Sequence, residues 1–200
     1  KGPEGLGTSW SCFHGVKRWK EDCGCTTGGD EGWNQKWRTP LRASLNWLRD
    51  ECAKVFESEG SKYLKDVWSA RNDYIDIMQS KDHHSIIKFF ARHGRVNLEK
   101  GGIDLVLKML EMEKYSLLMF TSCGWFFSDI AGIEAKQILK YACRALEFIH
   151  DITGADYEET FLSILKNAVP NDKKYPDAAI MYLKEIKPLS GKIKFDFFKG

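Results

Sequence analysis

The sequence lacks an excess of either charge and lacks any long hydrophobic segment. Its 30 basic and 28 acidic residues leave a formal net charge of +2. This near-balance argues against a dedicated nucleic-acid surface, because phosphate binding needs concentrated positive charge. The longest apolar runs fall far short of the roughly 20 residues that a membrane helix needs, and no signal peptide, repeat or low-complexity stretch is visible. We therefore expect neither a nucleic-acid partner nor a membrane partner.

Cysteine is present, but not at the density of a disulfide-stabilised miniprotein. Six cysteines are spread over 200 residues. Two of them, Cys52 and Cys143, fall at helical positions, where we expect small buried apolar groups. Reduced thiols are the ordinary state of cytosolic proteins, so we expect a cytoplasmic protein. The chain begins at Lys1 and not at methionine, from which we expect a fragment of a larger protein.

Hydrophobic residues at helical spacing run through most of the chain after residue 38. Apolar residues make up 43% of the sequence, enough for a sizeable core. We expect Thr39 to cap the first helix, with Pro40 at its first position, and Ser61 to cap the second. The hydrophobic segment 102–121 should be the central helix and pack against the helix over 130–152. The expected helices cover residues 40–60, 62–78, 82–93, 102–121, 130–152, 157–168 and 176–186.

These elements predict an all-α fold. We expect a bundle of about six to seven helices with an irregular N-terminal loop layer rich in Cys and Trp. Residues 1–38 form the irregular segment and residues 39–200 the helical domain, and the two together make a single domain. Residues 193–198 alternate apolar and polar side chains, which predicts a short strand or a docked tail.

The irregular segment holds a candidate metal-binding motif. Its sequence has Cys12-x-His14 and, further on, Cys23-x-Cys25. Three thiols and an imidazole could supply the four sulfur and nitrogen ligands that zinc favours. A single residue between paired ligands departs from the usual spacing of two to four. The alternative is that these side chains only pack and hydrogen-bond within a loop turned by glycine.

Tryptophan is concentrated in the same segment and follows no helical period. Trp10, Trp33 and Trp37 lie there, with Asn34 beside the second, and Trp125 begins an aromatic run after the central helix. A Trp ring offers a flat apolar face and a polar edge, which suit sugar rings and interfaces. We predict a binding surface on which Trp10, Trp33 and Trp125 converge. The alternative is that the rings cover the open end of the bundle.

Carboxylates give no catalytic signal. Asp22, Asp30, Glu31 and Asp129 lie in loops, but no pair has a recognisable arrangement for flanking a glycosidic bond. We therefore assign no catalytic residue, and we expect no catalysis by this chain alone.

Three stretches of the chain resemble one known family. They read TSWSCFHGVKRWKEDCGC (residues 8–25), GWNQKWRTPLRASLNWLRDE (residues 32–51) and MFTSCGWFFSDIAGIEAKQILKYACRA (residues 119–145). Together they resemble a C-terminal helical domain of unknown function that is attached to glycoside hydrolase family 57-like catalytic barrels. The resemblance extends over essentially the whole chain.

The resemblance implies an accessory role in carbohydrate metabolism. The family's catalytic carboxylates belong to the barrel, so the expected partner is an N-terminal catalytic barrel of the same polypeptide, in a glycoside hydrolase or glucan transferase-like enzyme. The expected ligand is α-glucan or an oligosaccharide in the groove between barrel and helices. The residues that the resemblance places along this groove are Trp10, Trp33, Asn34, Trp37, Trp125 and Phe126.

Three functions remain open from the sequence. The chain could complete the sugar groove of such an enzyme, it could be a structural module that holds a metal ion through its Cys/His loop, or it could only join two domains through its tryptophans. The sequence does not decide among them.

Overall fold

The structure, a computed structural model, describes residues 5, 7–9, 11–80, 82–96 and 98–191. Seven α-helices and no strand occur in these ranges, which confirms the predicted all-α fold. No helix there is long and apolar enough to cross a membrane. The helices are α1 (Arg38–Gly60), α2 (Val67–Ser80), α3 (His83–His93), α4 (Lys100–Leu118), α5 (Ile133–Thr153), α6 (Glu158–Leu165) and α7 (Ala178–Met181). The fold also has three short 3₁₀ helices among the described residues, η2 (Lys17–Trp19), η3 (Ser122–Trp125) and η5 (Lys187–Leu189), and a short π-helix, η4 (Tyr182–Ile186).

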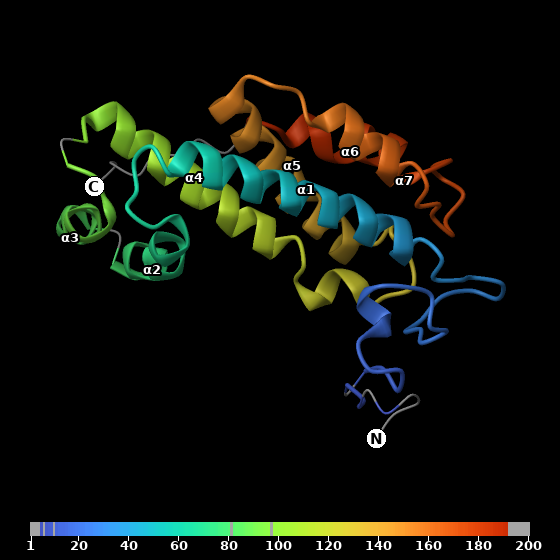
Figure 1. Cartoon of the computed structure of the whole chain (residues 1–200). Helices are drawn as coiled ribbons and strands as arrows, with labels where there is room; N and C mark the ends of the chain where they lie inside the picture. The colour runs from blue at the N-terminus through green and yellow to red at the C-terminus, as the bar shows by residue number, and fades with distance from the viewer. Residues whose placement is uncertain (1–4, 6, 10, 81, 97, 192–200) are drawn as a thin grey trace.

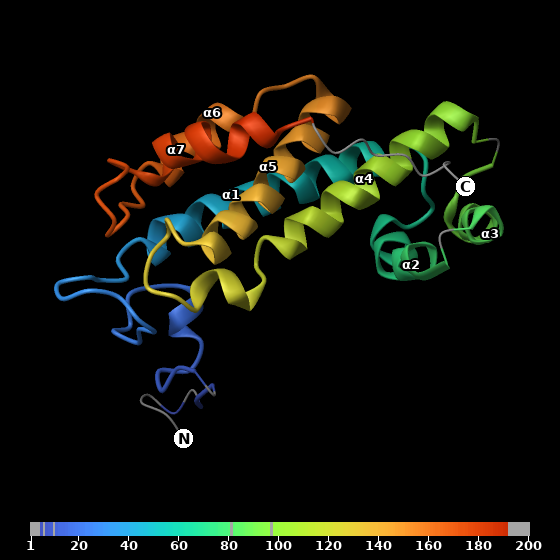
Figure 2. The ribbon, with the colours of Figure 1, turned by 180° about the vertical axis from the view of Figure 1, so that it is seen from behind.

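The long helices α1, α4 and α5 run side by side through the molecule (Figures 1 and 2). The α2–α3 pair lies at one end of α4, and the N-terminal segment lies at the opposite end of the bundle, next to the loop between α4 and α5. The α6 and α7 helices cover another side, where α6 packs on α1. The N-terminal segment therefore meets the bundle at one end only.

The core lies between α1, α4 and α5. The α4–α5 pair packs most extensively, as predicted, and α1 packs on both. Leu107 and Leu110 of α4 are both buried. However, Leu117 is 49% exposed, so α4 is not covered on all sides. The predicted central helix is therefore buried along most of its length and reaches the surface at its C-terminal turn.

Both predicted helix caps were wrong. The α1 helix begins at Arg38, ahead of Thr39, and no side chain caps it. Pro40 still fits because the first turn of a helix needs no N–H donors from its own residues. Ser61 does not cap α2, since its backbone N–H instead closes the end of α1. Asp66 lies directly before α2, and its carboxylate accepts the Ser69 N–H at 2.9 Å.

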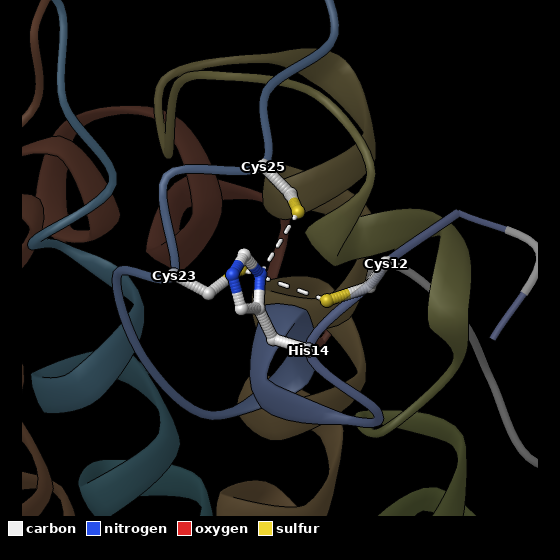
Figure 3. Close-up of side chains that lie close together, drawn as sticks. All are labelled: Cys12, His14, Cys23 and Cys25. Carbon is white, nitrogen blue, oxygen red and sulfur yellow. Dashed lines mark hydrogen bonds between the residues drawn. The ribbon is translucent and has the colours of Figure 1, made fainter. Parts of the chain in front are cut away.

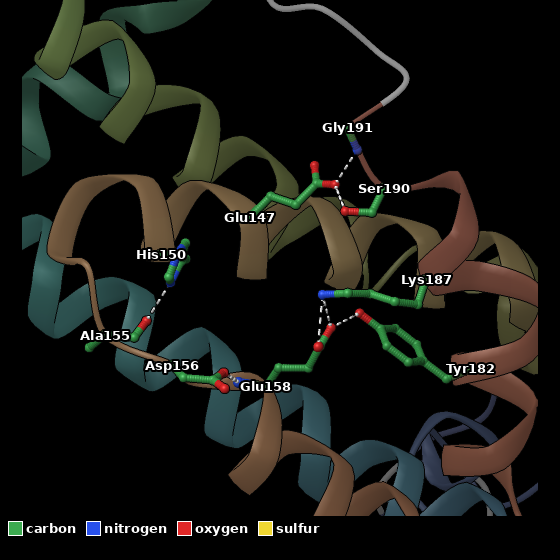
Figure 4. A network of polar contacts seen from close by, with 9 residues as sticks. All are labelled: Glu147, His150, Ala155, Asp156, Glu158, Tyr182, Lys187, Ser190 and Gly191. Atoms are coloured by element: carbon green, nitrogen blue, oxygen red, sulfur yellow. Dashed lines mark hydrogen bonds and ion pairs between the residues drawn. The ribbon is translucent and has the colours of Figure 1, made fainter.

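The last described residues are fastened to α5 and α6 by polar side chains (Figure 4). Glu147 of α5 accepts the Gly191 N–H at 2.7 Å. Glu158 of α6 accepts the Tyr182 hydroxyl at 2.9 Å and pairs with Lys187 at 2.7 Å. The strand or docked tail predicted for residues 193–198 lies outside the described residues.

Candidate metal centre

The two halves of the Cys/His motif come together in the folded N-terminal segment (Figure 3). The ligand atoms of Cys12, His14, Cys23 and Cys25 all lie within 4.8 Å of one another. The Cys12 and Cys23 sulfurs are 3.7 Å apart, and the Cys25 sulfur is 3.5 Å from Nδ1 of His14. All four cysteine and histidine side chains named in the sequence motif therefore face one point.

These separations match the edges of a zinc tetrahedron. With Zn–S bonds of about 2.3 Å and Zn–N bonds of about 2.0–2.1 Å, tetrahedral geometry places two sulfurs about 3.8 Å apart and sulfur and nitrogen about 3.5 Å apart. The cysteines are free thiols, and a disulfide would require its sulfurs to lie about 2.05 Å apart. The cluster thus has the donor set of a four-coordinate metal centre, and two of its separations match the edges of a zinc tetrahedron.

Glycine makes the one-residue spacings workable. Gly24, between Cys23 and Cys25, has φ +74°, and Gly15, directly after His14, has φ +69°. This left-handed conformation is easy for glycine and strained for other residues. The Asp22 carboxylate accepts the Gly24 N–H at 3.2 Å and supports the turn. The chain can therefore reverse within the motif and point both thiols inward.

The thiols differ in acidity. Burial favours the neutral form of Cys12, but hydrogen bonds from the Arg18 and His14 backbone N–H groups and from the Cys23 side chain lower its pKa below the ordinary value. Burial raises the pKa of Cys23 to about 11, and the neighbouring Cys12 charge adds to the rise. Coordination to a metal ion deprotonates both thiols.

Arg18 ties the ligand-bearing loop to the bundle. Its guanidinium donates to the Ser11 carbonyl at 2.6 Å and to the Thr27 hydroxyl at 2.5 Å, and it also donates to the Phe126 carbonyl. The same group lies 4.6 Å from the centroid of the Phe126 ring. Phe126 follows η3, so this one side chain links both sides of the metal motif to the loop between α4 and α5.

Arg38, at the start of α1, makes a second link of the same kind. Its guanidinium donates to the Cys25 carbonyl at 3.0 Å and to the Trp125 carbonyl at 3.2 Å. Burial lowers the pKa of this guanidinium, and the charge of Arg18 lowers it further. Both arginines are buried, and no local pattern in the sequence indicated this.

Two of the tryptophans predicted to bind carbohydrate lie in the core. Trp37 and Trp125 are buried and stack with their ring centroids 6.4 Å apart. The Trp37 indole N–H donates to the Ser128 carbonyl at 3.3 Å. Trp10 is outside the described residues, so its predicted convergence with Trp33 and Trp125 stays a prediction. In this structure the buried pair joins the start of α1 to η3 and offers no open face.

Trp33, Asn34 and Phe126 are the predicted residues with exposed surface in this structure. Asn34 is held through its backbone, because its N–H donates to the Asn171 side chain at 3.0 Å and its carbonyl accepts from that side chain at 2.8 Å. Neither Asn171 nor Ser128, which bonds Thr27, was singled out in the sequence. Contacts between residues this far apart in the chain leave no local signal.

A hollow of about 340 Å³ lies beside Trp33. Phe127, which is 44% exposed, contributes to its wall, and the carboxyl groups of Glu134 and Asp172 are at its edge. Trp33 lies so close to Gly29 that a β-carbon there would come within 3.0 Å of the ring. The remaining residues of the wall are Thr27, Gly28, Ser128, Asp129, Ala131 and Gly132.

The model of a family described only as a domain of unknown function (DUF3536) matches residues 33–194. No curated protein and no solved structure matches the chain. The match confirms the resemblance to a domain of unknown function, but its description makes no link to glycoside hydrolase family 57. The four candidate metal ligands precede residue 33, so the match gives no information about them.

Proposed function

Because the chain belongs to the DUF3536 family, whose description names no activity, we propose a function from the site itself. The chain is a structural module that holds one zinc ion through Cys12, His14, Cys23 and Cys25. The ion fixes the N-terminal segment on the end of the helical bundle. The observation that carries this proposal is the agreement of the 3.7 Å and 3.5 Å separations with the edges of a zinc tetrahedron.

The donor set favours zinc in a structural role. Thiolate and imidazole ligands suit zinc, and four protein ligands leave no open position for a water or a substrate. A catalytic zinc would keep such a position. Free thiolate ligands also suit a reducing compartment, and on that ground we place the protein in the cytoplasm.

The N-terminal segment needs a cross-link because it buries little apolar surface. Between residues 11 and 36, Cys12 is the one described hydrophobic side chain that belongs to the buried core. Ordering each residue costs about 1–2 kcal/mol of backbone entropy. Trp19 adds one partly buried ring packed against the core, and the hydrophobic contacts of these two side chains cannot offset that cost, whereas a bound structural zinc contributes about 10–16 kcal/mol in small domains.

Metal analysis tests the proposal. The protein purified without chelator should contain about one zinc ion per chain by mass spectrometry of its elements. Cobalt substitution should give the absorption bands of a tetrahedral thiolate site. Cys25→Ser should lose the metal, while the matched control Cys123→Ser, an exposed thiol outside the cluster, should retain it. Equal metal content in these two variants would contradict the assignment.

A second function is favoured by the hollow beside Trp33. We propose that this hollow contributes to an oligosaccharide groove, completed by the catalytic barrel that the sequence resemblance implies. An aromatic wall with carboxylates at its edge can stack a sugar ring and accept its hydroxyl protons. Trp33 and Phe127, which line the hollow, then carry the interaction. Asn34, next to Trp33, and Phe126, next to Phe127, would extend it.

Titration calorimetry of the full-length polypeptide with α-glucan oligosaccharides tests this second function. Trp33→Ala should weaken binding, while Trp68→Ala should not, because Trp68 packs on Phe56 between α1 and α2. If the wild type does not bind, or if both variants bind equally well, the oligosaccharide-binding function is refuted. The zinc module and the joining of two domains then remain as roles of this chain.

A further inference from the structure

Arg18 and Arg38 are buried cations without a carboxylate partner. Their exposed fractions are 3% and 0%, and neither forms an ion pair with an Asp or Glu among the described residues. The Nε atom of each also lacks a hydrogen-bond partner there. A guanidinium stays protonated in proteins, and a buried charge without a counter-charge is costly. The fold must therefore supply negative charge from another source.

The metal motif is one such source, since Cys23, Asp22 and Cys25 all favour the charged form of Arg38. Arg38 donates to the carbonyl of Cys25 itself, and Arg18 donates to the carbonyl of Ser11, directly before Cys12. Both guanidinium groups thus lie against the backbone of ligand residues or their neighbours. Three thiolates and a neutral imidazole around Zn²⁺ carry one net negative charge.

We propose that Arg18 and Arg38 are positioning residues of the metal centre: they neutralise its negative charge and couple metal binding to the attachment of residues 11–27 to the bundle end. The proposal rests on the zinc-binding function proposed above. It explains why each arginine also binds a carbonyl of the α4–α5 loop, Phe126 for one and Trp125 for the other. Binding of the ion then strengthens both links, because the ion fixes the ligand residues whose backbone the arginines bind.

Zinc affinity measured by competition with a chromophoric chelator tests the inference. Removing a group around the first ligand shell typically weakens metal binding about 10–100-fold, and we expect Arg38→Gln and Arg18→Gln to fall in that range. Arg38→Lys keeps the charge and should recover part of the loss. Arg92→Gln is the matched control, since Arg92 pairs with Asp73 on the surface at the far end of the bundle.

Two readouts separate this role from a purely structural one. Circular dichroism must show native helix content in each variant. If Arg38→Gln does not fold, Arg18→Gln is used for the comparison with the wild type. Limited proteolysis should then cut residues 11–27 of the Gln variants at zinc concentrations that protect the wild type. A structural role would not distinguish Arg38→Lys from Arg38→Gln in zinc affinity.

The outcomes are distinguishable from those of the proposed function. If the wild type binds zinc and the Gln variants bind it within about twofold of the wild type, the arginine inference is refuted and the zinc module stands. If the wild type binds no zinc, both are refuted. Weaker binding by the Gln variants with partial recovery in Arg38→Lys supports the inference.

Discussion

Glu113 of α4 should make the protein more stable in mild acid than in mild base. Its side chain is 4% exposed, and one carboxyl oxygen lacks a hydrogen-bond partner. Burial raises its pKa from 4.5 to about 7, with the charge of Arg71 opposing the rise and that of Glu57 adding to it. The structure thus holds a carboxyl group that resists ionisation.

The sign of the effect follows from proton binding. Below pH 4.5 the carboxyl is protonated in both states, and its ionisation costs no stability. As the pH rises from 4.5 to about 7, the folded state holds the proton that the unfolded state releases, so the free energy of unfolding falls. Each pKa unit is worth about 1.4 kcal/mol, so the full cost above pH 7 is about 3 kcal/mol.

Glu113→Gln removes the ionisation and keeps the shape. Urea unfolding at about pH 8 should show the variant to be more stable by about 3 kcal/mol, and the difference should vanish near pH 4. Glu159→Gln, on the exposed face of α6, should show no such pH-dependent difference. A gain in Glu113→Gln that is equal at both pH values, or no gain at pH 8, would refute the reasoning.

Three further outcomes follow from other parts of the structure. Leu107→Ala, at a buried site, should lower the free energy of unfolding by about 2–5 kcal/mol in the same assay, and Leu117→Ala, half exposed, by clearly less. Peroxide treatment of the metal-free protein should oxidise Cys12 and Cys23, whose sulfurs are 3.7 Å apart, to a disulfide while the peroxide is reduced to water. Peptide mapping detects this disulfide, and a bridge between other cysteines would contradict the geometry. Gly24→Ala places a residue with a β-carbon at a backbone φ of +74°, which costs about 1–2 kcal/mol. The zinc affinity measured by chelator competition should then be about tenfold weaker, and an unchanged affinity would show that this turn does not position the thiols.

The helices could be predicted from the sequence because their signal is local. Apolar residues repeat at helical spacing in every long helix, and glycine marks the ends of α1, α3 and α5. Helix starts were harder, since a cap depends on which side chain reaches the first turn. Asp82 caps α3 by accepting the Ser85 N–H, and the sequence predicted that this helix begins at about residue 82. The start of α1 depends instead on buried contacts of Trp37 and Arg38 with distant loops.

The candidate site was predictable to the extent that its chemistry is local. The four metal ligands stand out because they form two closely spaced pairs, Cys12 with His14 and Cys23 with Cys25, each next to a glycine. The burial of Trp37 and Trp125 could not be predicted from the sequence in the same way. Trp37 lies just before α1, where no apolar period indicates burial, and the ring that packs on it, Trp125, comes from η3 in the loop after α4. Only the fold shows that these two rings pack on each other.

The shape of the hollow beside Trp33 should depend on the loop that carries the metal ligand Cys25. Thr27 and Gly28, two and three residues after the ligand Cys25, line the hollow and bind the Ser128 hydroxyl through their backbone. A zinc ion that fixes Cys25 therefore also fixes one wall of the hollow.

If oligosaccharide binds in this hollow, removal of the metal should weaken binding even though no metal ligand touches the hollow. Calorimetry with and without a chelator, followed by return of zinc, measures this. Full recovery after zinc is restored would tie the loss to the metal. Equal affinity with and without zinc would show that contacts to Ser128 hold the wall unaided and that the zinc module acts only on the N-terminal segment.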